Sequence, residues 1–115
     1  MREQKPEKAK FELQRAIRLN PKNILAHELL SIIFYRQQRI REAEKHAAIA
    51  VSINPKSSRA LFVLGAINAK RGRSDLALEQ LQTALVALPD AEYRAEARDL
   101  LNKIRSQSDD VQPAS

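Results

Sequence analysis

The amino-acid sequence predicts an all-α protein built from a repeated pair of helices. Ala, Leu, Ile, Glu, Lys, Arg and Gln dominate its 115 residues, and these residue types favour helices. Only two glycines and five aromatic residues are present, which leaves little material for strands and hairpin turns. Pro21, Pro55 and Pro89 recur at intervals of 34 residues. This spacing indicates an internal repeat.

Length and composition indicate a single soluble domain. A chain of this length can bury one core but not two independent ones. The lack of cysteine excludes disulfides, thiolate metal sites and cysteine nucleophiles. No signal peptide and no run of eighteen apolar residues is visible, so we expect a cytoplasmic protein. The net charge of +6 bears mainly on solubility and on weak affinity for acidic partners.

A shift of the chain by 34 residues superimposes columns of small residues and columns of apolar residues. The column partners in three copies are Ala9, Ala43 and Ala77; Ala16, Ala50 and Ala84; Ile17, Val51 and Leu85; and Leu19, Ile53 and Ala87. The partners in two copies are Ala26 and Ala60, Leu30 and Leu64, Ser31 and Gly65, and Gln38 and Gly72. Apolar residues recur at helical spacing within each half of the repeat, so each half predicts one amphipathic helix.

Each column has a structural meaning. The alanine columns, with Ser31 and Gly65, allow two helix axes to approach closely, while the leucines fill the space between them. Proline cannot continue a helix, so the three prolines end the second helix of each pair. Asn23, Ser57 and Asp90 then stand where an N-cap is needed.

These signals predict six helices, at residues 6–20, 24–37, 41–54, 58–71, 75–88 and 91–106. The first matches only the second helix of a repeat, so a first helix is lacking before it. In the last, the apolar stripe lies two residues later than the repeat predicts, and we interpret this segment as a capping helix. Residues 107–115 are polar, and we expect a disordered tail there.

At these positions the chain resembles the tetratricopeptide repeat family. The matching residues in one repeat are His27, Leu30, Ser31, Phe34, Ala43, Ala47, Ala50 and Pro55; in the next they are Leu61, Leu64, Gly65, Asn68, Ala77, Leu81, Ala84 and Pro89. The departures are His27 and Leu61 in place of the family's tryptophan, Asn68 in place of its tyrosine, and Ala47 and Leu81 in place of its second-helix aromatic residue. The resemblance implies a short right-handed α-solenoid of antiparallel helix pairs. We expect one domain at 1–106, with a half repeat (6–23), two repeats (24–57 and 58–91) and a capping helix (91–106).

The resemblance also implies a non-catalytic protein–protein interaction module, an adaptor or assembly scaffold whose first helices line a concave groove. The expected groove row is Leu25, Glu28, Ile32, Tyr35, Arg59, Phe62, Ala66 and Ala69. This row is largely apolar, with Glu28 and Arg59 at its rim, and suits an extended peptide or an amphipathic helix. The alternative is that so short an array buries this face in its core or covers it with its own tail.

Two other surfaces are candidates. A basic edge at the turns could touch nucleic acid or another polyanion, although no aromatic residues interleave with the bases and solvated turns are the simpler interpretation. The residues of this edge are Arg36, Arg39, Arg41, Lys70, Arg71 and Arg73. Phe11 and Leu13 lie on the first helix, which lacks its usual partner, and they predict a homodimer or the docking of a partner helix. The chain could also be a fragment of a longer repeat protein.

The sequence carries no recognisable catalytic or cofactor motif, and we expect no enzyme activity, metal or cofactor. His27 and His46 are the only histidines, and His27 occupies a packing position, so a satisfied imidazole is a better interpretation than a metal ligand. Glu42 and Glu44 are interpreted as solvated helix charges. No Gly-rich phosphate loop, nucleophile elbow or zinc-binding helix occurs.

Overall fold

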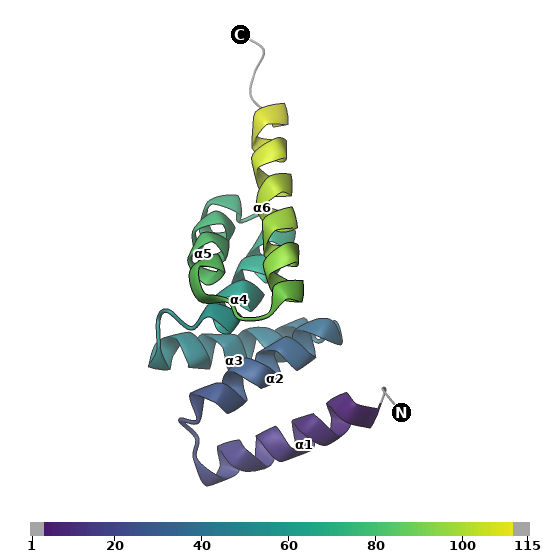
Figure 1. Cartoon of the computed structure of the whole chain (residues 1–115), viewed down its shortest axis with the longest axis vertical. Coiled ribbons are helices and arrows are strands. Elements are labelled where there is room, and N and C mark those ends of the chain that lie inside the picture. The colour runs from purple at the N-terminus through teal and green to yellow at the C-terminus, as the bar shows by residue number, and fades with distance from the viewer. Residues whose placement is uncertain (1–3, 112–115) are drawn as a thin grey trace.

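The computed structural model describes the chain from residue 4 to residue 111, with side chains from 6 to 107, and this part of the chain is entirely helical apart from its turns (Figure 1). Its helices are α1 (Gln4–Leu19), α2 (Ile24–Arg36), α3 (Ile40–Ile53), α4 (Ser58–Lys70), α5 (Ser74–Ala87) and α6 (Ala91–Val111). The first five begin and end within two residues of the predicted bounds. The predicted all-α repeat solenoid is confirmed.

Consecutive helices pack against each other along an elongated array of 58 × 32 × 24 Å (Figure 1). The first helices of the pairs also contact one another, since α4 packs against both α2 and α6. In this arrangement α6 occupies the position of a third first helix, while α1 is a second helix with no first helix beside it in the described chain.

The columns of small residues form the contact between the helices of each pair. Ala43, Ala47 and Ala50 on α3 are fully buried, as are the equivalent residues of α5. Gly65 is required for the close approach of α4 and α5, because a Cβ atom at this position would lie 2.7 Å from Cγ of Leu81. The small residues therefore set the distance between the paired helices.

The turn inside each pair has the same left-handed residue in both repeats. Gln38 has φ of 64° and Gly72 has φ of 78°. The backbone closes each turn in the same way, with Arg39 N–H donating to the Phe34 carbonyl and Arg73 N–H donating to the Asn68 carbonyl, both at 2.9 Å. The pairing of Gln38 with Gly72 in the sequence thus reflects a shared helix C-terminal motif.

The three predicted N-caps behave differently. Asn23 caps α2, since its side chain accepts a hydrogen bond of 3.0 Å from the Ala26 N–H. Ser57 precedes α4 but makes no side-chain cap, because its hydroxyl donates to the Glu28 carboxylate. The Asp90 carboxylate, just before α6, lies 3.1 Å from Nε of Arg59. Two of the three side chains therefore link neighbouring first helices.

The C-terminal end of the last helix differs from the prediction. Helix α6 continues to Val111 and includes residues 107–111, which were predicted to belong to a disordered tail. No glycine or proline interrupts the chain between Ala91 and Val111, and Pro113 is the first residue after Pro89 that cannot continue a helix. The remaining predicted tail residues, 112–115, lie outside the described part.

Within the described residues, no helix is both long and apolar enough to cross a membrane.

Candidate partner-binding surfaces

The predicted groove row is largely buried in the structure. Ile32, Tyr35, Phe62 and Ala66 all belong to the core. Leu25, at the start of α2, is 50% exposed. The other three members of the row, Glu28, Arg59 and Ala69, are half-buried.

Helix α6 closes this face from the other side. The Tyr93 ring lies 5.2 Å from the Phe62 ring, and the Tyr35 ring meets Phe62 edge-on at 5.7 Å. The Tyr35 hydroxyl donates a hydrogen bond of 2.6 Å to the Glu96 carboxylate. Burial, followed by this hydrogen bond, raises the pKa of Tyr35 well above its ordinary value. Arg36 donates to the Tyr93 hydroxyl at 2.9 Å, so two polar links join α2 to α6 across α4.

The structure therefore matches the alternative in which this face is partly core. The physical reason is the position of Tyr93 and Glu96, which continue the row by one more repeat, 34 residues after Arg59 and Phe62. The prediction of α6 as a capping helix out of the repeat register left these two residues out of the row. Binding through Phe62 would require α6 to move, because Tyr93 packs on its ring.

Three of the six residues in the predicted basic edge form ion pairs. Arg36 lies 3.2 Å from Glu92, and Arg71 lies 2.8 Å from Glu44. Arg39 pairs with Glu42, and the ammonium of Lys70 lies 5.0 Å from the centre of the Tyr35 ring. Arg41 and Arg73 are exposed. The pairs reduce the positive field that a polyanion would meet along this edge.

The N-terminal side of the array is incompletely covered. Phe11 is 59% exposed and Leu13 is half-buried. Ala9 and Ala16 are also half-buried, although their column partners on α3 and α5 are fully buried.

The same contrast appears on α2. Leu29 and Ile33 are half-buried, whereas their equivalents on α4, Val63 and Ile67, are almost fully buried. We call the surface formed by Ala9, Leu13, Ala16, Leu29 and Ile33 the open face.

A recess of about 410 Å³ lies between α1 and α2 beside the open face. It reaches from the start of α1 to the start of α6, and its lining is Pro6, Ala9, Ile32, Ile33, Arg36, Gln37 and Tyr93. Apolar side chains therefore provide most of its wall, and Arg36 and Gln37 add a charged and a polar group.

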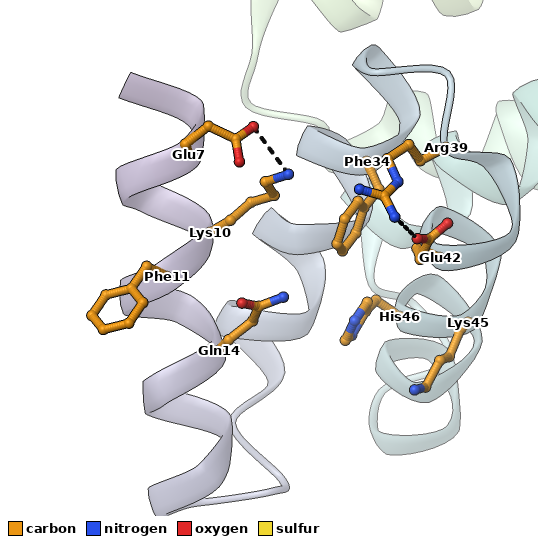
Figure 2. Close-up of a pocket in the computed structure, with 9 residues that line it drawn as sticks. All are labelled: Glu7, Lys10, Phe11, Gln14, Phe34, Arg39, Glu42, Lys45 and His46. Carbon is orange, nitrogen blue, oxygen red and sulfur yellow. Dashed lines mark hydrogen bonds and ion pairs between the residues drawn. The ribbon is translucent and has the colours of Figure 1, made fainter. Parts of the chain in front are cut away.

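A second recess, of about 500 Å³, lies between α1 and α3 (Figure 2). Lys10 enters it from α1 and is only 8% exposed. Its ammonium lies 3.0 Å from the Gln37 side-chain oxygen, 3.1 Å from the Glu7 carboxylate and 5.2 Å from the centre of the Phe34 ring. The Lys10 hydrogen bond lowers the pKa of Glu7.

This recess was not predicted, and its charges are mostly satisfied within the chain. Arg39 and Glu42 pair on its α3 side, and Phe11 points away from α3 (Figure 2). Its lining of mixed charges offers no convergent set of groups for a ligand of one sign.

The two histidines contact each other between α2 and α3. His27, which is 3% exposed, places its Nε2 2.9 Å from the Pro21 carbonyl and its Nδ1 3.0 Å from Nδ1 of His46. A carbonyl only accepts, so Nε2 of His27 carries the proton and His46 donates from Nδ1. Burial is the largest cause that lowers the pKa of His46 to about 4, and the neighbouring His27 ring and Lys45 ammonium act in the same direction. This geometry agrees with a satisfied imidazole at His27, and no cluster of three metal-binding side chains occurs in residues 6–107.

Comparison with known proteins identifies the repeat. A family model described as tetratricopeptide repeat matches residues 1–57 and, a second time, residues 29–92. Together the matches span the half repeat, both complete repeats and the beginning of α6. A comparison with curated proteins found no significant match. Because the matches cover most of the chain, and the phased prolines and paired helices agree with them, the protein belongs to the tetratricopeptide repeat family.

Proposed function

We propose that this protein is a non-catalytic adaptor that binds a helix of a partner protein on its open face. Tetratricopeptide repeats generally mediate protein–protein interactions, and the family membership supports this class of function. The observation that supports the open face as the binding site is the unequal burial of equivalent residues. Ala9 and Ala16 are half-buried, whereas Ala43, Ala50, Ala77 and Ala84 are fully buried beneath a helix.

The surface chemistry supports a helix as the ligand. Helix α2 covers the alanine column of α3, and α4 covers that of α5. The open face presents the same column on α1 together with Leu29 and Ile33 of α2. An amphipathic helix that lays its apolar side on this surface would remove it from water, which favours binding.

The concave row is a second candidate for partner binding. Leu25 is half exposed there, beside Glu28 and Arg59, and a partner could contact this rim without displacing α6. Glu28 and Arg59 already bind Ser57 and Asp90, however, so the rim has fewer groups to offer. A homodimer through Phe11 and Leu13 is the third candidate.

Matched variants separate these candidates. Ala9→Lys with Ala16→Lys places two long charged side chains on the open face at half-buried helix positions. Leu25→Glu alters the concave rim. We expect affinity capture with the wild-type protein and with Leu25→Glu to retain the same partners, and capture with the double lysine variant to lose them.

The opposite pattern, with loss only from Leu25→Glu, would move the site to the concave row. If both variants still capture the partners, and the partners dissociate as the salt concentration rises, the binding site would be the basic edge. Circular dichroism of each variant controls for loss of the fold.

A further inference from the structure

We infer that the partner helix carries a glycine opposite Leu13. This inference rests on the proposed function and specifies the chemistry of the ligand. Its basis is the way the two complete repeats pair one residue of a second helix with one residue of a first helix.

The first observation concerns α4 and α5. A Cβ atom on Gly65 would lie 2.7 and 2.8 Å from two side-chain carbons of Leu81 and 3.3 Å from its backbone nitrogen. Contacts this short do not occur in folded proteins, so even alanine at this position would force Leu81 or one of the two helices to shift. A leucine at this position of a second helix therefore requires glycine on the helix that packs against it.

The other complete repeat has a different pair at the same positions. Ala47 takes the place of Leu81, and Ser31 takes the place of Gly65. Both residues are fully buried. The smaller side chain on α3 thus leaves room for a serine on α2. A leucine on the second helix is paired with glycine on the first, and an alanine on the second helix is paired with serine on the first.

The open face has the leucine version of this column. Leu13 is equivalent to Ala47 and Leu81, and it is half-buried between the two half-buried alanines of α1. A helix that docks at the spacing of α4 on α5 must therefore present glycine to Leu13. The best internal example of such a helix is α4 itself, in which Leu64 precedes Gly65.

A second copy of this chain does not meet the requirement. The whole sequence contains two glycines. Gly65 is buried between α4 and α5, and Gly72 lies in the turn after α4. Two α1 helices packed on each other would bring leucine against leucine. We therefore choose a helix of a different protein, rather than a second copy of these residues, as the ligand of the open face.

A peptide with the sequence of residues 58–70 is a suitable probe, and the same peptide with Gly65→Ser is its matched control. Fluorescence anisotropy should show the glycine peptide binding about tenfold more tightly to the wild-type protein, because a side chain opposite Leu13 overpacks the contact. The Leu13→Ala protein should lose this preference, as the Ser31–Ala47 pair predicts. An equal affinity of both peptides for the wild-type protein contradicts the glycine requirement.

If the free peptide is too short to form a helix, the same helix can be fused to the N-terminus of the protein instead. Residues 58–73 are joined in front of Pro6, in place of residues 1–5, because residue 74 is equivalent to residue 6. We expect the glycine version to raise the Tm by about 5 °C or more. The serine version should raise it only in the Leu13→Ala background. Equal Tm values for the two versions on wild-type Leu13 overturn the inference.

The outcomes also separate the inference from the proposed function. If neither peptide binds and neither fusion raises the Tm, the open face is not a helix site and both fail. If both probes act equally, the helix site stands and the glycine requirement fails. Sedimentation velocity that shows a dimer abolished by Ala9→Lys with Ala16→Lys overturns the choice of a different protein.

Discussion

The two ends of the array differ in how completely their helices are covered. At the C-terminal end, Tyr93, Ala97, Leu101 and Ile104 of α6 are all buried and cover α4 and α5. At the N-terminal end, α1 packs only on α2 and leaves its alanine column half-buried (Figure 1). The same repeat sequence thus produces one closed end and one open face. In a repeat array the end residues decide which surface stays available, because each helix packs only on its neighbours.

Helix α6, which closes the C-terminal end, also covers part of the concave face. Tyr93 covers Phe62, and Tyr35 and Arg36 reach across to α6. In so short an array, a single terminal helix contacts the first helices of both repeats through its side chains. The helix that completes the core therefore also fills the groove in which a longer array would hold a ligand.

The largest expected effect comes from weakening the closed end. Leu101→Ala removes a buried side chain from α6 and should lower the free energy of unfolding by about 3 kcal/mol. Urea denaturation followed by circular dichroism measures the change. The matched variant at the open end is Phe11→Ala, which removes a side chain that is 59% exposed. It should change the same free energy by less than about 0.5 kcal/mol, and equal losses from both variants would contradict the contrast between the ends.

Acid should destabilise the half of the molecule near the open face. The pKa of His46 is lowered from 6.5 to about 4 in the folded chain. The folded state thus favours neutral His46, whose contribution is complete above pH 6.5 and is lost as the pH falls from 6.5 towards 4. His46 is half-buried, so after allowance for solvent we expect a loss of roughly 1 to 2 kcal/mol.

Urea denaturation at pH 7 and at pH 4.5 measures this loss, and His46→Gln supplies the control. Glutamine occupies the equivalent position, Gln80, in the other repeat, where it accepts a hydrogen bond from Asn68. The variant removes the titrating imidazole but keeps a donor for His27. A pH dependence as steep in His46→Gln as in the wild type would show that the His46 imidazole does not cause the effect.

The link between α2 and α6 should contribute a smaller amount. Tyr35→Phe keeps the buried ring and removes the hydroxyl that donates to Glu96. We expect the free energy of unfolding to fall by about 1 kcal/mol, since Glu96 is half-buried and regains water. Glu96→Gln retains an acceptor oxygen and should cost less. A larger loss from Glu96→Gln than from Tyr35→Phe would show that the hydrogen bond is not what holds α6 against α2.

The sequence predicted the features that depend on local pattern and period. Helix bounds follow from apolar spacing and from the prolines, and the Asn23 cap follows from its place before α2. The closed concave face could not be read locally, because the Tyr35–Glu96 and Arg36–Tyr93 bonds join residues 61 and 57 positions apart. One signal was present, since the 34-residue period places Glu96 in the same column as Glu28 and Phe62.

Polar side chains with more than one possible partner were also hard to predict. Ser57 stands at an N-cap position, yet its hydroxyl binds Glu28 on the preceding first helix. The sequence determines that a serine precedes α4, but the choice between capping and bridging depends on the distance between α2 and α4. The partial exposure of Leu13, by contrast, could be predicted, because the repeat pattern starts with a second helix and shows no first helix packed on α1.

The smallest expected effect is a gain in stability near the open face. Gln38 and Gly72 hold the same left-handed conformation in equivalent turns, but only glycine adopts it without strain from a Cβ atom. Gln38→Gly should therefore raise the free energy of unfolding by about 0.5 to 1 kcal/mol, since relief of the strain exceeds the added backbone entropy of the unfolded chain. Thermal denaturation measures it, and Gly72→Gln, which introduces the same strain into the repeat next to α6, should lower the Tm by a similar amount. If Gln38→Gly instead lowers the Tm, the glutamine side chain makes contacts in this turn that outweigh its strain, and the two turns are equivalent in shape but not in energy.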